Sequence, residues 1–322
     1  MNNRYQKMVC ALSGGLLSAI LLVGCGKAVD KNITAEVAAP VVVAPAKVAE
    51  AVHAELLGTY VGRFEPTPAF AKVIKDYDVW LEKYGDFGGS RNLNETPAPF
   101  RKYMYRNALD GTFELISPNR LALVLDEMRE DNTFTAHSVA AGNERLVTGT
   151  WSAVGKGFHL MGKEPGDKPI DGVFDMTLNT ADASVMGTWQ SNAAHSEAKK
   201  LVLKKIEFKY DAKRAQNPDR DDEYVNLGRS EFDKNPSVDV LKSSDVENLT
   251  QKQIRVIRNL IFARHGYSFG AEDLRRMFEA YDWYQPLTTD VKDVLTEVEK
   301  NNLAILKRYE KYADTHYDEF GR

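Results

Sequence analysis

The chain has 322 residues, of which 43% are hydrophobic, 10% aromatic and 27% charged, and its formal net charge is −4. This is a normal globular composition, and the length is sufficient for two domains that bury cores of their own. A mildly acidic chain argues against nucleic-acid binding, which needs a basic face.

The first 25 residues have the pattern of a bacterial lipoprotein signal. Arg4 and Lys7 precede an apolar run over residues 8–23, which is too short and too rich in glycine for a transmembrane span. The run ends in Leu-Val-Gly-Cys, the form of a lipobox whose cysteine sulfur accepts a diacylglyceryl group. We therefore expect a signal peptide over residues 1–24 and lipidation of Cys25. The alternative is an ordinary secretory signal with a chance cysteine.

Lipidation of Cys25 would anchor the chain permanently, because buried acyl chains contribute about 0.8 kcal/mol per methylene group. Gly26 follows, rather than the aspartate that resembles an inner-membrane retention signal, so we expect the outer membrane, facing either the periplasm or the exterior. Cys10 would leave with the signal peptide, so no disulfide is expected. Loss of Arg4 and Lys7 would lower the net charge by two, from −4 to −6.

Two regions follow the lipobox. Residues 25–51 are rich in Ala, Val and Pro, which is typical of an extended tether. Residues 52–209 contain short runs of β-branched and aromatic residues between Gly, Asn and Asp turns, with a helical insertion near residues 66–108 whose helix covers residues 70–84. The runs predict an antiparallel sheet or a small barrel of about eight strands, over residues 57–64, 120–125, 133–139, 145–152, 157–161, 173–178, 184–190 and 200–208.

Three copies of a Gly-Thr-aromatic motif recur in this β-domain, ending at Tyr60, Trp151 and Trp189. Glycine before an aromatic residue fits a strand that bends or lets its neighbour approach closely, with the ring filling the space. We interpret these rings, together with Phe174, as core. The alternative is a lipocalin-like cavity that the rings line, which requires an interior that they do not fill.

Residues 210–242 form a charged linker that we expect to be solvated, and residues 243–322 have a helical pattern. Capping boxes are predicted at Ser244 to Glu247, Thr250 to Gln253 and Thr296 to Glu299. The second box precedes a helix that closes at His265-Gly266, where glycine suits the left-handed position. A short helix over residues 274–281 and a third helix after Thr296 complete a small three-helix domain.

Several motifs in this region occur in the order seen in one family. Ile-Arg-Asn at residues 257–259 leads into Phe-Ala-Arg-His-Gly at residues 262–266, followed by Trp-Tyr-Gln-Pro at residues 283–286 and Glu-Lys-Asn-Asn at residues 299–302. The segment Leu249 to Tyr309 resembles the YARHG domain, with Phe262 in place of the tyrosine. The resemblance implies an extracytoplasmic helical domain of bacterial envelope proteins, and it brings no established reaction or catalytic residue.

Arg264, His265, Trp283 and Tyr284 are the candidate ligand-binding residues. On one face, arginine would supply a bidentate fork and the aromatic rings a stacking plane for a glycan, a peptide stem or a carboxylate. The alternative is structural, with Arg264 paired to Asp282 or Glu279, His265 capping its helix and Trp283 in the core. An Arg-His-Gly phosphatase site is not expected, because the triplet ends an amphipathic helix rather than a buried parallel strand.

No catalytic residues are assigned, and no cofactor or metal is expected. The six histidines are scattered, and Asp167, Asp171 and Asp175 lack the spacing of a calcium loop, so turn chemistry is their expected role.

The sequence therefore predicts an α+β chain in which an antiparallel, barrel-like β-domain precedes the three-helix domain. The function expected is non-enzymatic binding or scaffolding in the bacterial cell envelope, with peptidoglycan or another envelope protein as candidate partner and no nucleic acid. One alternative is a peptidoglycan-acting enzyme or its accessory. Another is lipocalin-like binding of a small molecule by the β-domain.

Overall fold

The computed structural model describes residues 50–84, 93–94, 96–109, 111–215 and 232–316, all within the compact unit Val48–Arg322. The expected signal peptide, Cys25 and residues 25–49 of the expected tether lie outside the described residues, as do residues 216–231 of the linker. None of the helices in the described ranges is long and apolar enough to cross a membrane.

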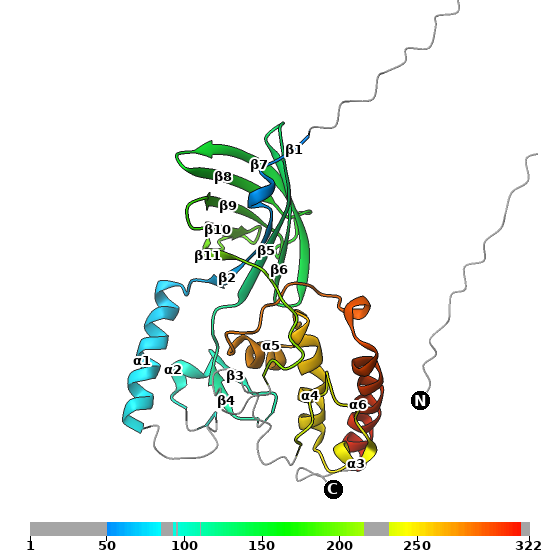
Figure 1. Ribbon diagram of the computed structural model, residues 1–322. Helices are drawn as coiled ribbons and strands as arrows, with labels where there is room; N and C mark the ends of the chain where they lie inside the picture. The colour runs from blue at the N-terminus through cyan, green and yellow to red at the C-terminus, as the bar shows by residue number, and fades with distance from the viewer. Residues whose placement is uncertain (1–49, 85–92, 95, 110, 216–231, 317–322) are drawn as a thin grey trace, which may run out of the picture. The chain divides into compact units, whose positions relative to one another are not determined.

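Eight antiparallel strands form a closed barrel, so the predicted α+β class with a barrel-like β-domain is confirmed. Strands β5 to β11 follow one another as a meander, and β2 closes the ring because it pairs with β11 on one side and β5 on the other. Figure 1 shows the ring. The barrel strands are β2 (Gly58–Phe64), β5 (Arg120–Arg129), β6 (Thr133–Ala140), β7 (Asn143–Val154), β8 (Gly157–Lys163), β9 (Gly172–Asn179), β10 (Ser184–Ser191) and β11 (Lys199–Ile206).

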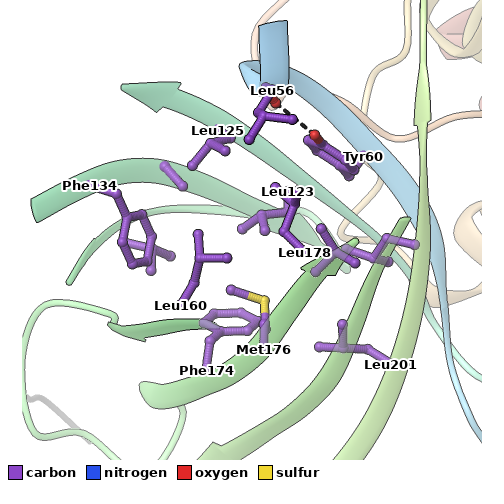
Figure 2. Packing of buried hydrophobic residues seen from close by; sticks show 14 of the residues in the cluster. Leu56, Tyr60, Leu123, Leu125, Phe134, Leu160, Phe174, Met176, Leu178 and Leu201 are labelled. Atoms are coloured by element: carbon purple, nitrogen blue, oxygen red, sulfur yellow. Dashed lines mark hydrogen bonds between the residues drawn. The ribbon is translucent and has the colours of Figure 1, made fainter. Parts of the chain in front are cut away.

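The barrel interior is filled by alternate residues of these strands, as the period of two requires. Figure 2 shows the packed side chains, and Tyr60 donates a hydrogen bond from its hydroxyl to the Leu56 carbonyl at 2.6 Å. Tyr60 and Phe174 are buried, which confirms them as core, whereas Trp151 and Trp189 are partly buried and pack against the cluster.

The repeated glycines permit close approach of neighbouring strands, as predicted. A Cβ atom on Gly149 would lie 2.0 Å from the Met161 carbonyl oxygen, and one on Gly187 would lie 2.1 Å from the Asp175 carbonyl oxygen. Both contacts are with backbone atoms, which cannot rotate away as a side chain can.

One end of the barrel is closed by the segment before β2. The short strand β1 (Ala51–Val52) pairs with β5, and the 3₁₀ turn η1 (Ala54–Leu56) inserts Leu56 into the core. The ring of His53 lies 5.2 Å from that of Trp151 and 4.5 Å from that of Phe158. The side chains of Leu56 and His53 therefore cover this end of the barrel.

The insertion predicted near residues 66–108 contains α1 (Pro68–Tyr84), α2 (Ala98–Arg101) and β3 (Met104–Arg106). It extends further than predicted, because β3 pairs with β4 (Phe113–Leu115). The β3–β4 pair was not predicted. Its strands have three residues each, which is too short for an alternating pattern to stand out.

The C-terminal region contains α3 (Ser243–Val246), α4 (Gln251–Arg264), α5 (Glu272–Glu279), the turn η2 (Lys292–Val294) and α6 (Glu297–His316). Helix α4 contributes to two apolar clusters, with Val256 and Leu260 in one and Ile257 and Ile261 in the other. The second cluster includes Leu306 of α6. Helix α4 is therefore the central element of this helical domain.

The expected helix ends are confirmed for α4 and α6 and wrong for α3. Thr250 and Thr296 each accept a hydrogen bond from the backbone three residues later, and Gly266 has a left-handed φ of 76°. Helix α3 begins earlier than predicted, because the Asp245 carboxylate accepts the Lys242 N–H at 2.7 Å. The Ser244 to Glu247 box is therefore not formed.

Two arginines of the barrel bind the carbonyl end of α5. Arg63 donates to the Glu279 carbonyl at 2.5 Å, and Arg120 donates to the Glu279 and Tyr281 carbonyls at 3.3 and 2.9 Å. Cations suit this position because the last carbonyls of a helix carry negative partial charge. On the outer face of the barrel, Leu287 packs against a small apolar cluster of β2, β5 and β6.

Substituting Gly187 with alanine should destabilise the barrel by about 1–3 kcal/mol, because the new methyl group overlaps the Asp175 carbonyl. Gly270→Ala is the matched control, since a Cβ atom there meets nothing within 4 Å and should change stability by less than about 0.5 kcal/mol. Urea denaturation measures both. Equal midpoints for the two variants would contradict the close approach of β9 and β10.

Candidate functional site

Arg264 lies at the end of α4 and is buried, with 3% of its surface exposed. Its Nε donates to the Arg214 carbonyl at 2.8 Å, and Nη1 donates to Asn235 Oδ1 at 2.7 Å and Ser237 Oγ at 2.9 Å. Burial lowers the pKa of this guanidinium to about 10. Three hydrogen bonds thus attach the helix end to both described parts of the linker.

The expected pairing of Arg264 with Asp282 or Glu279 is wrong. Asp282 lies 3.4 Å from Arg120, and Glu279 lies 3.7 Å from Arg276, so both acids have other cationic partners. Neutral oxygen atoms of the linker surround Arg264 instead. The linker ends therefore differ from the expected solvated connection, and Ser237 and Leu241 are buried.

His265 forms a buried pair with Glu299, at 2.9 Å between Nε2 and Oε2. The Tyr210 ring stacks on the imidazole with a centroid separation of 4.2 Å, and the Tyr210 hydroxyl donates to Glu299 Oε1 at 2.9 Å. Burial alone raises the pKa of Glu299, but hydrogen bonds from groups including His265, the Thr296 N–H and Tyr210 outweigh it and lower the pKa to about 2.

Asn302, the last residue of the Glu-Lys-Asn-Asn motif, also holds the linker. Its side-chain amide donates to the Pro236 and Asp239 carbonyls at 2.8 and 2.7 Å, and its oxygen accepts the Leu241 N–H at 2.9 Å. Arg264, His265, Glu299 and Asn302 thus all bind residues before α3. In this chain the motif residues fasten the linker to α4 and α6.

Trp283 and Tyr284 point to different surroundings. Tyr284 is fully buried, and its hydroxyl donates to the Tyr267 carbonyl at 2.7 Å. Trp283 is partly buried and lines a pocket of about 440 Å³ together with Arg264. His265 and Tyr284 do not line this pocket, so the four candidate residues do not share one cleft.

A second pocket, of about 400 Å³, lies at the barrel end opposite His53 and η1. It is formed where β2, β6, β8 and β10 end and where their antiparallel neighbours begin. We call it the barrel mouth. Its volume is in the range typical of small-molecule sites, and its walls combine the apolar side chains of Leu121, Phe174 and Ile170 with polar ones.

The polar side of the barrel mouth is built around Glu164, which is 4% exposed. Glu164 follows β8 directly and accepts hydrogen bonds from Ser138 Oγ at 2.8 Å and from Trp189 Nε1 at 3.2 Å. Arg145 lines the same pocket and forms an ion pair with the buried Asp171. Asp171 also accepts the Lys168 N–H at 3.0 Å, so its predicted turn role is confirmed. The same prediction is wrong for Asp175, which lies within β9 and pairs with His159.

Trp189 and Phe174 were predicted as core, with cavity lining as the alternative, and Ser138, Arg145 and Glu164 were not predicted as site residues. A usable signal is the alternation within each strand. Ser138 is two residues after the buried Ala136, and Arg145 is two residues before the buried Val147. Polar residues at such inward positions mark the point where a filled barrel interior gives way to a solvent-accessible end.

Within the described residues, no group of three or more His, Cys, Asp or Glu side chains is placed to hold a metal ion. Residues 237–311 match the model of the YARHG domain, so the chain carries this domain at the position where the motifs indicate it. No curated protein and no solved structure matches the chain significantly.

Glu299→Gln should destabilise the protein by roughly 3 kcal/mol at neutral pH, because the variant leaves His265 and Tyr210 without their buried anionic partner. The folded pKa of about 2 lies below the ordinary value of 4.5, so the wild-type advantage is complete above pH 4.5 and shrinks as the pH falls towards 2. Denaturant unfolding across this range measures the difference.

Glu297→Gln is the control, because this glutamate in the first turn of α6 is largely exposed and pairs only with Lys300 in the described contacts. It should cost less than about 1 kcal/mol. A Glu299→Gln variant as stable as the control at pH 7 would contradict the role of the His265–Glu299 pair.

Proposed function

We propose that this YARHG-domain chain is a lipid-anchored, extracytoplasmic protein of the bacterial cell envelope, and that it acts by binding rather than by catalysis. The anchor would be Cys25 of the lipobox, and the expected location is the outer membrane. The ligand site would be the barrel mouth. The lipocalin-like alternative required an interior that the aromatic rings do not fill, and the barrel interior is filled. The pocket at the barrel end supports small-molecule binding by the β-domain in a narrower form, and it supports this over binding at the Arg264 and His265 face.

The observation that carries the proposal is the composition of the barrel mouth. A pocket of about 400 Å³ places the buried Glu164 and the indole of Trp189 beside apolar wall residues. Small-molecule sites combine these features, since apolar walls supply affinity and a few fixed polar groups supply orientation. The hydrogen bonds that Glu164 accepts from Ser138 and Trp189 hold its carboxylate in place.

The Arg264 and His265 face gives less support to a peptidoglycan-acting enzyme. Arg264 and His265 are 3% and 7% exposed, and their described hydrogen bonds go to the linker and to Glu299. His265 faces Glu299 and Tyr210 rather than the pocket that Arg264 and Trp283 line, so the two groups do not act together on one open surface. Peptidoglycan and another envelope protein stay as predicted partners for the chain as a whole.

Cys25→Ser should release the protein from the membrane. Cell fractionation is expected to recover the wild type with membranes and the variant with soluble extracytoplasmic proteins, because the acyl chains supply the anchoring free energy. Cys10→Ser, within the expected signal peptide, is the control and should leave the protein in the membrane fraction. Recovery of both variants with the membrane would contradict lipidation at Cys25.

Ala140→Leu should abolish ligand binding at the barrel mouth, because Ala140 lines the pocket and a larger side chain fills it. Residues 25–322 carrying Cys25→Ser are incubated with a small-molecule extract of cell envelopes, washed and denatured, and the released compounds are identified by mass spectrometry. Compounds enriched on the parent and lost on Ala140→Leu are the expected result. Ala153→Leu, at an exposed position of β7 outside the pocket, is the control and should retain them.

If no compound is enriched on the parent, or if Ala140→Leu and Ala153→Leu retain the same compounds, the barrel mouth is not the ligand site.

A further inference from the structure

An aromatic corner at the barrel mouth already holds an ammonium group of the chain. The rings of Phe64 and Trp189 lie 6.1 Å apart with an interplanar angle of 53°. Lys199 places its Nζ 5.7 Å from the Phe64 centroid and 5.2 Å from the Trp189 centroid. Both distances are within the range of a cation–π contact. All three residues line the pocket.

The same indole connects this corner to a buried carboxylate. Trp189 presents its ring face to Lys199 and donates its N–H to Glu164 at 3.2 Å. The other described donor to Glu164 is the neutral hydroxyl of Ser138. A cation that enters the corner therefore meets an aromatic face and, beyond the edge of the same ring, the negative charge of Glu164.

The charges of the pocket decide which sign of ligand it accepts. Its lining contains the cations Arg145 and Lys199 and the anion Glu164. Arg145 is neutralised by Asp171, which is 2% exposed, whereas Lys199 is exposed and extends from the first residue of β11. When Lys199 turns outward, the pocket keeps Glu164 as its uncompensated charge. A positive ligand in the place of Lys199 would then restore the charge balance of the pocket.

Replacing a lysine by a ligand cation is favourable when the ligand is less strongly hydrated. A lysine ammonium is compact and strongly hydrated, so it regains solvation when it leaves the rings. An alkylated ammonium has a weaker hydration shell to lose, and aromatic corners are a common recognition device for quaternary ammonium groups. The apolar wall of Leu121, Phe174 and Ile170 would take the rest of such a ligand.

From this geometry we infer that the barrel mouth binds a small amphiphile whose alkylated ammonium group replaces the Lys199 ammonium between Phe64 and Trp189, with Glu164 as its counter-charge. This inference rests on the proposed function and names its ligand class.

The experiment uses three probes with the same six-carbon chain and different head groups. Hexyltrimethylammonium, hexanoate and hexanol are titrated into residues 25–322 carrying Cys25→Ser, and binding is measured by calorimetry. Hexyltrimethylammonium should bind at least about tenfold more tightly than the other two, because it alone gains the Glu164 and ring contacts. The Ala140→Leu variant should lose this binding.

Two substitutions at the site should act in opposite directions. Glu164→Gln keeps the size of the side chain and removes its charge, so it should weaken binding of hexyltrimethylammonium about tenfold or more. Lys199→Met removes the competing ammonium and should tighten binding about two- to fivefold. Because Lys199→Met predicts a gain, a loss of folding cannot imitate its result.

Lys200→Met is the matched control, since Lys200 is exposed, adjacent in β11 and absent from the pocket lining. It changes the net charge by the same amount, so it should leave binding unchanged if the effect of Lys199 is local. Equal tightening in both variants would overturn the displacement of Lys199.

The outcomes separate this inference from the proposed function. Preferential binding of hexanoate or hexanol, lost in Ala140→Leu, would overturn the ammonium inference and leave the barrel mouth as a ligand site. Failure of all three probes would also overturn it, while the envelope-extract experiment would still decide the proposed function. Binding of hexyltrimethylammonium that is unaffected by Glu164→Gln would overturn the counter-charge role.

Discussion

The pairing of β5 on both of its sides is the constraint on which this structure depends. β5 bonds to β6 along the meander and to β2 across the closure, with a register shift between Leu125 and Glu127. Without the β2 pairing the sheet would have two open edges and an unsealed interior, whose exposed backbone groups invite pairing with other chains. The same strand begins with Arg120, which binds the carbonyl end of α5. Barrel closure and attachment of the helical domain therefore rely on one strand.

The local elements were largely predictable, because their signals are local. Each barrel strand coincides with an alternating run bounded by turn residues, and the Thr250 and Thr296 caps mark the starts of α4 and α6. The sequence left two alternatives, an antiparallel sheet and a small barrel, because the pairing of β2 with β5 that closes the barrel joins segments separated by the whole insertion. The partners of Arg264 were wrongly predicted for a similar reason, because Asn235 and Ser237 approach it only after the linker folds back.

In the candidate site, motif residues of types that often bind ligands or catalyse reactions instead hold the fold together. Arg264, His265, Glu299 and Asn302 carry groups that suit ligand binding or acid–base chemistry, yet each binds the linker or a neighbour that does so. A buried arginine or histidine needs such partners, because an unpaired polar group in the interior is costly. Glu164 and Lys199 of the barrel mouth make fewer described polar contacts within the protein. Among the described contacts, Glu164 accepts hydrogen bonds from two neutral donors, and the Lys199 ammonium contacts only aromatic rings. Both charged groups therefore remain available to a ligand.

The closed end of the barrel has a mechanical consequence. The chain enters the described unit through β1, whose ladder with β5 consists of the pairs Ala51 with Arg129 and Val52 with Met128. Tension applied from the N-terminal side would break this short ladder first and then load β2, which is bonded to β5 and β11 along its length. Between these two stages, the pull would break the hydrogen bond from Tyr60 to Leu56 and the contacts of the His53 ring. Until β2 itself is displaced, a pull of this kind acts on the end of the barrel opposite Glu164, and the barrel mouth keeps its shape.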